Sequence, residues 1–529
     1  MGCAVVLLAC GGDDDGLSDG GFDASAEDAP ADVGIDVNAP TVPWPHRLPD
    51  TAELGDRRGR RLARTIIHLH SPLSHDACDG EGFVDGALAD ETCLAHFRDS
   101  LCALRIDAAM VTDHAPHLNE VTLEEALWIQ PGDAPVMDET GGVFANRIAC
   151  EDGHRTLVTV GSENAIMPLG LRRHPGDSDT PSTPEELITL YDGRDAAAAD
   201  VFREAGALIW VAHTEEHPLD FFREIDVDGI ELYNLHADVD PRIRSEHLGL
   251  EDGGYLGELL KFGRPAFRLE PDLAVLAFLS RQGVSLDKWD TLLAEGTRVA
   301  GSGGCDAHEN ALSMPLGDGE RGDSYRRMMI WITNHLLVDV PASGVVEPDA
   351  VEDALEAGRF YVTHEVFGTP MGFDFTANEG GAVFEMGEDA PLGSTLRVVR
   401  PTLPDGFPQN PGPTVTLHLI RSEEGGGVEV AMAAEGDIEF VVDEAGAYRA
   451  EVRMMPEHAR EYVRATADVL IHEVNWVYSN PIFVGVPVAE SAPLPDGLRA
   501  RVGRDQSAYF RARAERALSG LRAVDAPGR

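Results

Sequence analysis

Hydrophobic positions follow two different patterns along the chain, and the change comes near residue 370. Between about residues 62 and 365, short apolar runs alternate with longer segments of helical periodicity, such as 90–105 and 183–206. This alternation predicts a parallel, barrel-like α/β domain. The runs are "TIIHLH" (65–70), "AAMVTDH" (108–114), "TLVTVGSEN" (156–164), "ALIWVAHT" (207–214), "GIELYN" (229–234) and "RVAGSGGCDAH" (298–308). Past about residue 370, short alternating segments divided by Gly, Pro and Asp, such as "TVTLHLIRS", predict an antiparallel β-sandwich.

Composition adds two terminal parts to this division. Residues 11–45 are rich in Asp, Ala, Gly and Pro and have almost no aromatic residues, which predicts a disordered acidic tether. The last forty residues are rich in Arg and predict a solvated helix rather than a membrane-surface segment. The expected parts are a signal and tether (1–45), the α/β domain (46–370), the β-sandwich (371–490) and an Arg-rich tail (491–529).

The first residues, "MGCAVVLLACGGDDD", resemble a bacterial lipoprotein signal in which Cys10 is lipidated. The alternative is a frayed apolar terminus. The resemblance implies an exported protein, either a membrane-anchored lipoprotein or a periplasmic or extracellular protein. No later run is apolar for about eighteen residues, so a membrane contact is expected only through this lipid anchor.

Charge narrows the class of partner. The chain has 42 basic and 92 acidic residues, for a formal net charge of −50. Binding a nucleic-acid backbone requires clustered cations, so no nucleic-acid partner is expected. The chain also has no GxxxxGK[ST] phosphate loop.

The cysteines favour disulfides over a thiolate metal site. No CxxC spacing occurs, and neither CxxH pair has the second cysteine pair that a zinc site needs. In an oxidising compartment we expect one or two disulfides. Our choice is Cys78–Cys93, because that bond would pin the loop after the first apolar run, and the odd count leaves one free thiol.

Five of the apolar runs end in side chains that bind divalent metals. Because the carboxyl ends of parallel strands gather at one end of a barrel, these groups are expected to converge. Residues two apart on a strand share a face, so His68 and His70, and likewise Asp306 and His308, can point into one cavity. Imidazole mixed with carboxylate suits Zn, Mn or Fe. The set is His68, His70, Asp76, Asp113, His114, Glu163, His213, Asp306 and His308.

Each of these residues also has an ordinary interpretation. A lone histidine after a strand is usually a satisfied polar group, Glu163 alone could be an acid at a helix N-terminus, and Asp113 alone could cap a turn. The accumulation of such residues in one domain favours metal. Six other histidines are expected to be ordinary: His96, His174, His335, His418, His458 and His472. Five residues beside the set are left open: His75, Asp79, His117, His217 and His236.

Taken together, "HLHSPLSHD", "VTDH", "GSEN", "VAHTEEHP", "ELYN" and "GCDAH" resemble the PHP (polymerase and histidinol phosphatase) superfamily over about residues 62–365. The continuation into "ALEAGRFYVTH" and "YSNPIFVGVP" resembles its CehA/McbA-like branch. The resemblance implies a distorted (β/α)7 barrel, followed by a C-terminal antiparallel β-sandwich, that holds two or three divalent ions (Zn, Mn or Fe). The ligands that it implies are His68, His70, Asp76, His114, Glu163 (bridging), His213, Asp306 and His308.

The sequence departs from the family pattern at three places. Ser71 replaces the usual Thr, and Ile66 stands where an acid often precedes the HxH motif. Where some relatives supply a further histidine, this chain has "ELYNLH", so Asn234 or His236 is expected to substitute.

The implied function is a metal-dependent hydrolase that activates water, with a phosphoester as the first choice of substrate. The alternatives are an amide or carbamate hydrolase on the same site, and a catalytically idle surface-anchored binding protein. Asp306 or Asp113 would orient the water, and His308 or His213 would protonate the leaving group. Arg172 and Arg173 are candidates to grip a small anionic substrate, and their alternative is a role as ordinary surface arginines.

Overall fold

The computed structural model describes residues 43–176, 182–250, 254–340 and 344–486. Cys10, the acidic segment up to residue 42 and the tail from residue 487 therefore lie outside the described residues. Trp44 is buried against Phe407 and Tyr462, so the packed part of the chain includes a position inside the range expected as tether. No helix in the described part of the chain is long and apolar enough to cross a membrane.

The six apolar runs of the first pattern form six neighbouring strands of a seventeen-stranded sheet. They are β1 (Arg61–Leu69), β4 (Ala108–Val111), β7 (Arg155–Val160), β9 (Leu208–Val211), β10 (Gly229–Asn234) and β11 (Ala300–Ala307). Their pairings are parallel: β7 with β4, β4 with β1, β1 with β11, β11 with β10, and β10 with β9. Their carboxyl ends therefore lie at one end of the array, as the sequence predicts.

Three further strands extend this part of the sheet. They are β5 (Ala134–Met137), β6 (Val143–Ala149) and β8 (Met167–Leu169). β8 pairs antiparallel with β9, and β6 pairs antiparallel with β7. Among the described strands the pairings do not close into a ring, so the structure is a mixed α/β fold and the (β/α)7 barrel stays a prediction.

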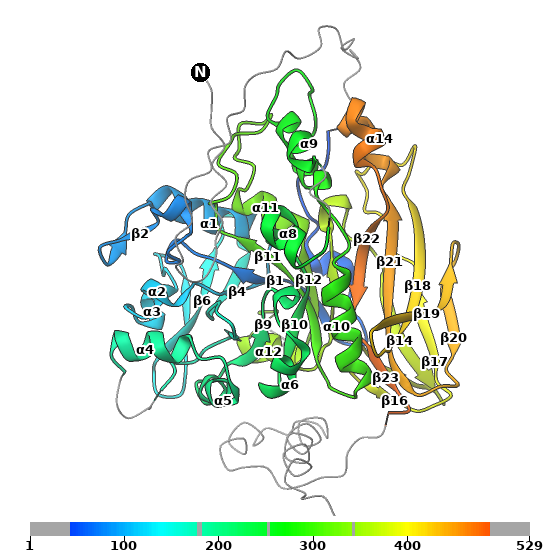
Figure 1. Cartoon of the computed structure of the whole chain (residues 1–529), viewed down its shortest axis with the longest axis horizontal. Helices are drawn as coiled ribbons and strands as arrows, with labels where there is room; N and C mark the ends of the chain where they lie inside the picture. The colour runs from blue at the N-terminus through cyan, green and yellow to red at the C-terminus, as the bar shows by residue number, and fades with distance from the viewer. Residues whose placement is uncertain (1–42, 177–181, 251–253, 341–343, 487–529) are drawn as a thin grey trace, which may run out of the picture.

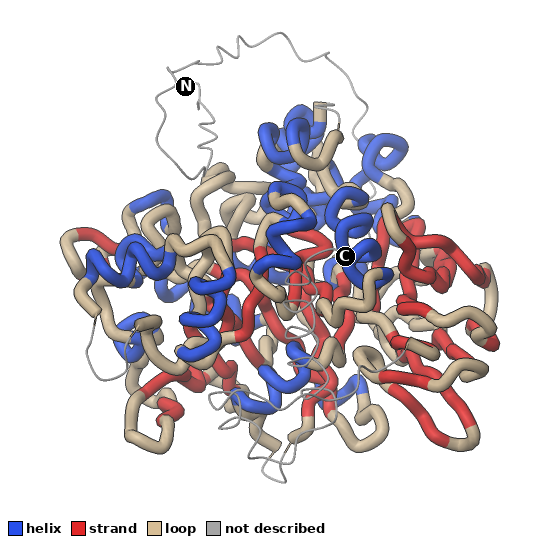
Figure 2. The backbone as a smooth tube through the Cα atoms, turned by 60° about the horizontal axis from the view of Figure 1, so that its bottom comes forward, coloured by secondary structure: helices blue, strands red, loops and turns tan. Residues whose placement is uncertain are grey.

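Helices follow most of the parallel strands and lie on the outside of the array (Figures 1 and 2). The expected helix at 90–105 is α1 (Glu91–Ala103), which begins where Asp90 accepts hydrogen bonds from the amides of Thr92 and Cys93. The segment 183–206 forms two helices rather than one, because "DGRD" (192–195) ends the first helix and caps the second. The helices in the region up to residue 370 are α1, α2 (Ala115–Leu118), α3 (Leu123–Ala126), α4 (Pro184–Tyr191), α5 (Ala196–Glu204), α6 (Leu219–Glu224), α7 (Leu235–Val239), α8 (Pro241–Glu246), α9 (Tyr255–Phe262), α10 (Gly283–Ala294), α11 (Tyr325–Trp331) and α12 (Pro348–Glu356).

The second pattern forms antiparallel strands, which Figure 1 shows in yellow to orange on one side of the molecule. β12 (Thr333–Val338) and β13 (Phe360–Thr363) lead into β22 (Val474–Ser479), β21 (Gly446–Met455), β18 (Thr414–Glu423) and β19 (Gly426–Ala433). A separate four-stranded sheet has the order β15 (Ala382–Phe384), β14 (Asp374–Glu379), β17 (Thr395–Val399) and β20 (Ile438–Val441). The large sheet thus runs across residue 370, and both the domain boundary there and the sandwich stay predictions.

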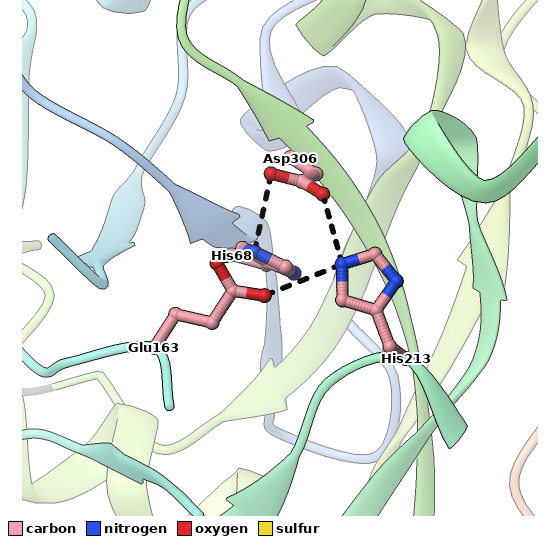
Figure 3. Close-up of side chains that lie close together, drawn as sticks. All are labelled: His68, Glu163, His213 and Asp306. Carbon is pink, nitrogen blue, oxygen red and sulfur yellow. Dashed lines mark ion pairs between the residues drawn. The ribbon is translucent and has the colours of Figure 1, made fainter. Parts of the chain in front are cut away.

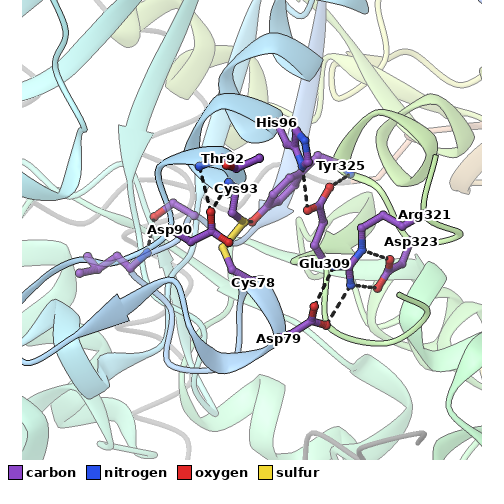
Figure 4. The surroundings of a disulfide bond; sticks show 12 residues. Cys78, Asp79, Asp90, Thr92, Cys93, His96, Glu309, Arg321, Asp323 and Tyr325 are labelled. Carbon is purple, nitrogen blue, oxygen red and sulfur yellow. Dashed lines mark hydrogen bonds and ion pairs between the residues drawn. A yellow bond between two sulfur atoms is a disulfide. The ribbon is translucent and has the colours of Figure 1, made fainter. Parts of the chain in front are cut away.

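The disulfide predicted between Cys78 and Cys93 is present and ties the loop after β1 to α1 (Figure 4). A second bond joins Cys102 to Cys150. Among the five described cysteines, Cys305 is free and buried, which agrees with the expected single free thiol.

Candidate metal centre

The predicted ligands come together at the carboxyl ends of the parallel strands. His68 lies near the end of β1 and His70 directly follows that strand, while Asp306 lies near the end of β11 and His308 directly follows it. His114, Glu163 and His213 follow β4, β7 and β9, and Asp76 comes from the loop after β1. Figure 3 shows four of these side chains converging from four separate elements.

The Glu163 carboxylate lies among four imidazoles. Its Oε2 atom is 3.1 Å from Nε2 of His68, 3.2 Å from Nε2 of His70 and 3.5 Å from Nε2 of His114. Its Oε1 atom is 3.3 Å from Nε2 of His213. The two oxygens thus face different histidines, which is the arrangement of a carboxylate that bridges two ions.

The Asp306 carboxylate also lies among four imidazoles. Its Oδ1 atom lies 3.2 Å from Nε2 of His68 and 3.3 Å from Nε2 of His70. Its Oδ2 atom lies 3.3 Å from Nε2 of His213 and 3.3 Å from Nδ1 of His236. His236, which the sequence left open, therefore belongs to the cluster.

Asp76 extends the cluster on its other side. Its Oδ2 atom lies 3.6 Å from Nε2 of His114 and 3.6 Å from Nε2 of His308. The Ser74 hydroxyl donates to its other oxygen at 2.7 Å. The eight ligands implied by the family resemblance thus form one connected network of carboxylates and imidazoles.

The histidines of the network present the ring nitrogen that a metal needs. In His68, His114 and His308, Nδ1 lies 2.8 Å from Glu231 Oε1, 3.0 Å from the Glu163 carbonyl and 2.7 Å from the Asp306 carbonyl, respectively. In His213, Nδ1 lies 3.1 Å from Glu215 Oε1. Each of these partners accepts, so Nδ1 carries the proton and the lone pair of Nε2 is directed at the network.

The chemistry and geometry of these donors fit divalent ions. The buried Nε2 atoms of His68 and His70 have no hydrogen-bond partner, although buried polar atoms are normally satisfied. Ligand atoms within 4.8 Å of one another form overlapping groups around the network that share Glu163, Asp306 and His114. The groups are His68, Glu163, His213 and Asp306; His70, His114 and Glu163; His236, Asp306 and His308; and His75, Asp76 and His114. These groups can hold two or three ions that share carboxylates.

The backbone is strained where it supplies ligands. His68, His213 and Asp306 have φ angles of 66°, 45° and 50°, which non-glycine residues rarely adopt. At His68 the register of β1 against both neighbouring strands shifts by one residue. Such positions cost about 1–3 kcal/mol each and persist at functional sites. The two ends of the HxH motif therefore reach one carboxylate through a bulge rather than through a regular strand.

The carboxylates and imidazoles of the network shift one another's pKa values, and a divalent ion would displace any extra proton from the imidazoles when it binds. Burial lowers the pKa of His68, but Asp306, Glu163 and Glu231 outweigh burial and raise it well above its usual value. Burial raises the pKa of Glu163, but the histidines around it, His68 first, hold that pKa well below its usual value. Burial lowers the pKa of His308 to about 4, so its imidazole is neutral at pH 7, as a metal ligand must be.

Three residues that the sequence predicts to be functional form their hydrogen bonds and ion pairs outside the metal network. Asp113 accepts hydrogen bonds from the Ser71 amide at 2.6 Å and from the Ser71 hydroxyl at 2.7 Å. Arg172 pairs with Asp349 and Glu352 at 2.8 and 2.6 Å, and its guanidinium lies 4.1 Å from the centroid of the Phe144 ring. Arg173 donates to the carbonyls of His174, Gly176 and Glu204. None of the three bonds to the metal network among the described residues, and for the two arginines the ordinary alternative fits better.

Two supporting carboxylates were not singled out from the sequence. Glu231, buried on β10, contacts Nδ1 of His68 and also accepts a hydrogen bond from the His213 amide at 3.0 Å. It supplies the acid that is missing at Ile66. A Cβ on Gly304 would lie 2.0 Å from Glu231 Oε1, so the glycine makes room for this side chain. The only sequence signal is a charged residue inside a buried run. Glu215 holds His213 in the same way.

The residues that the sequence left open divide between two roles. The His75 ring centroid lies 5.0 Å from that of His114, and His75 belongs to one of the ligand groups. Asp79 pairs with Arg321, while Nδ1 of His117 contacts the Leu73 carbonyl. His217 stacks on Phe221 with ring centroids 4.7 Å apart. These last three have structural partners.

Comparison with known proteins gives limited likeness. No family model matches the chain, and no curated protein matches it. Among solved structures, the chain is similar to a two-domain protein from Bacteroides vulgatus that contains a predicted PHP-like metal-dependent phosphoesterase. The identity is 12%, the match covers 76% of this chain and 92% of that chain, and the TM-score is 0.27. The chain is also similar to a lesion-specific endonuclease from Pyrococcus furiosus, with 10% identity, coverage of 56% of each chain and a TM-score of 0.27. At these TM-scores neither likeness carries an argument about this chain.

Proposed function

We propose that this protein is a metal-dependent hydrolase of the PHP superfamily that acts on a phosphoester of a small molecule. One observation carries the proposal: Glu163 and Asp306 each lie within 3.5 Å of at least three imidazoles whose Nε2 or Nδ1 atoms face them. Such shared carboxylates are what a centre of two or three ions requires.

The residues divide the chemical work as follows. Bound divalent ions supply Lewis acidity and lower the pKa of water to near neutral. Asp306 is the better placed of the two candidate acids to orient that water, because both Asp113 oxygens are engaged by Ser71. His213 and His308 border the network, and His213 is the better candidate to hand a proton to the leaving group. Burial lowers the pKa of His213, but Asp306, Glu163 and Glu215 outweigh burial and raise it well above its usual value, whereas the pKa of His308 is lowered to about 4. Their Nδ1 partners fix the orientation of both rings.

A catalytically idle binding protein is the weaker alternative. A binding scaffold gains nothing from buried, unpartnered Nε2 atoms on His68 and His70, which cost stability unless a ligand satisfies them. An amide or carbamate hydrolase would use the same centre, and the ligand set by itself does not discriminate between the two reactions.

The finer fold is part of the proposal: a distorted (β/α)7 barrel with a β-sandwich, as in the CehA/McbA-like branch. The run of parallel pairings among β7, β4, β1, β11, β10 and β9 supports the barrel. The separate four-stranded antiparallel sheet supports a second layer beside β18 and β21.

The test is a panel of phosphate monoesters, phosphate diesters, aryl amides and carbamates, assayed with the purified protein reconstituted with Zn, Mn or Fe. We expect hydrolysis of at least one phosphate ester that is abolished by a chelator and restored by metal. Turnover of amides alone would favour the alternative reaction. A metal-loaded protein that turns over none of these substrates would favour the idle protein.

We also infer export, with Cys10 as a lipidated residue. The lipoprotein-like run before Cys10 supports this, and so do the two disulfides, because disulfides persist in oxidising compartments. Fractionation of cells that express wild type and Cys10→Ser tests it. Retention of the variant on the membrane would exclude lipidation at Cys10.

A further inference from the structure

A cavity borders the metal network beside Asp306, His236 and His308, which all line it. These three residues form one of the groups that could hold an ion, with Nδ1 of His236 at 3.3 Å from Oδ2 of Asp306. A molecule whose reacting group lies on that ion therefore has this cavity directly beside it.

The other walls of the cavity are mainly apolar. They come from α7, α9, α11, the loop after β11 and the surroundings of a 3-10 helix, η4 (Pro271–Ala277). The larger apolar side chains on these walls are Val239, Leu259, Val275, Phe278, Leu312 and Met328. All except Val239 are buried. Contact with an apolar group is favourable on such a surface, whereas a charged group would lose its hydration there.

The carboxylates that line the cavity are held by other partners. Asp323 accepts hydrogen bonds from the Arg321 guanidinium at 2.6 Å and from two amides of its own loop at 2.8 and 2.7 Å. Glu309 accepts from the Tyr325 amide at 3.3 Å and lies 3.2 Å from Nδ1 of His96. None of the described residues that line the cavity is Lys or Arg. The cavity therefore offers no counter-ion to a second anionic group, and its carboxylates would repel one.

The size of the cavity limits what it can hold. Its volume is about 30 Å³, against about 10–15 Å³ for a cavity that holds one water molecule. Protein cores leave few voids larger than a water molecule, and an apolar void is a poor site for water, which needs polar partners. The cavity is therefore suited to a short apolar group and is too small for a large ring system.

We propose that this cavity binds the organic part of the substrate, and that this part is a short, uncharged, apolar group of about two to four carbon atoms. The scissile phosphoester lies on the ions beside Asp306, and the apolar group extends from it between α9, η4 and α11. The inference rests on the proposed function, which it deepens by naming the substrate class. Met328 and Ala274, which line the cavity from α11 and η4, set the length of the group.

Calorimetric titration of the metal-loaded full-length protein with alkylphosphonates tests the cavity without turnover, because these compounds are not hydrolysed. The series is methyl-, propyl-, butyl- and octylphosphonate, and carboxyethylphosphonate is the charged counterpart of butylphosphonate. Each methylene up to butyl should tighten binding by about threefold, so butylphosphonate should bind at least about tenfold more tightly than methylphosphonate. Binding of carboxyethylphosphonate and of octylphosphonate should each be at least about tenfold weaker than that of butylphosphonate. Equal Kd values for methyl- and butylphosphonate, equal binding of carboxyethylphosphonate, or no binding of any of them at up to about 10 mM would overturn the proposal.

Two variants test whether the apolar group lies in this cavity. Met328→Ala lengthens the cavity, so octylphosphonate should gain about tenfold in affinity relative to butylphosphonate. Ala274→Val fills it, so butylphosphonate should lose about tenfold in affinity and methylphosphonate far less. Met329→Ala is the matched control, because Met329 is the next residue of α11 and is 0% exposed but does not line the cavity. It should leave the order of affinities unchanged. If Met328→Ala fails to fold, Ala274→Val alone decides. An unchanged order of affinities in the variants that fold would show that the alkyl group binds elsewhere.

Steady-state hydrolysis of methyl phosphate and butyl phosphate separates this inference from the proposed function. We expect kcat/KM to be at least about tenfold higher for butyl phosphate. Hydrolysis of both esters with equal kcat/KM would overturn the assignment of the cavity and leave the hydrolase in place. Hydrolysis of neither ester, with butylphosphonate still the tighter ligand in the wild type but not in Ala274→Val, would overturn the phosphoesterase and keep the cavity as a binding site.

Discussion

Two buried clusters of charged side chains differ in how completely they are satisfied. In the arginine network that joins β21 to α10, Arg449 donates to Asp290 at 2.9 and 2.8 Å and to Glu451 at 2.7 Å. The Ser422 hydroxyl occupies a further position on Asp290 at 2.6 Å. In the metal network, carboxylate oxygens and imidazole nitrogens converge at 3.1–3.6 Å, and the Nε2 atoms of His68 and His70 remain unpartnered.

This difference indicates that the arginine network stabilises the fold, whereas the cluster of carboxylates and imidazoles binds a further component. A buried ion pair that satisfies all its donors needs no third component, although removing one partner is costly. A cluster in which lone pairs converge and backbone strain gathers is built around something else. Burial and charge alone do not distinguish the two regions, so the unpartnered Nε2 atoms are what mark the proposed metal site.

The largest expected effect is at Glu163. Glu163→Ala should lose at least one equivalent of metal, essentially all hydrolysis and some thermal stability, because the carboxylate serves two groups of ligands. Glu163→Gln keeps the shape without the charge and should lose metal with less damage to the fold. Metal content and melting temperature of both variants are the measurements. Full metal occupancy in Glu163→Ala would show that Glu163 is not a ligand.

A substitution in the arginine network should lower the stability of the protein and leave its metal content unchanged. Asp290→Asn leaves the buried Arg449 with one carboxylate and should lower the free energy of unfolding by about 3–5 kcal/mol, with metal content unchanged. Asp437→Asn is the exposed control, since Asp437 pairs with the half-exposed Arg397 at 2.8 Å, and it should cost less than about 1 kcal/mol. Urea denaturation measures both. Loss of metal in Asp290→Asn would contradict the assignment of a purely structural role to the arginine network.

Sequence reasoning predicted that these side chains converge, because residues at the ends of successive parallel strands must meet. That logic needs only strand order and pattern, and all eight ligands implied by the family resemblance converge. It left His236 open, because whether the residues after β10 turn toward Asp306 depends on the start of α7. The helical pattern over 183–206 did not show that the segment divides into two helices, because "DGRD" supplies both a helix end and the cap of the next helix.

The residues that support the ligands were harder to predict. Glu231 reaches His68 only because β11 lies between β10 and β1 and carries a glycine at position 304, which is a fact of three-dimensional packing. Arg172 and Arg173 looked like anion binders because they follow Glu163 closely. Their partners, such as Glu352 and the Glu204 carbonyl, lie 180 and 31 residues away and have no local signal.

A smaller effect is expected at Glu231. Glu231→Gln keeps the size of the side chain but weakens the hold on Nδ1 of His68, so metal affinity should fall by about 10–100-fold while the fold is kept. Competition with a chelator of known affinity measures the change. An unchanged affinity would mean that Glu231 serves only the packing of β10 under Gly304.

The smallest effect is expected at Arg172. Because its guanidinium is held by Asp349 and Glu352, Arg172→Gln should change KM and kcat by less than about twofold and cost at most about 1 kcal/mol of stability. Steady-state kinetics on the best substrate of the panel is the check. A large rise in KM would restore Arg172 as a substrate-binding residue.

Elemental analysis of the full-length protein, purified under mild conditions without chelators, tests the central claim most directly. The overlapping groups of carboxylates and imidazoles predict two or three equivalents of Zn, Mn or Fe per chain, which dialysis against a strong chelator removes together with activity. A protein that carries no transition metal after mild purification, and takes up none when Zn, Mn or Fe is added, would contradict the account.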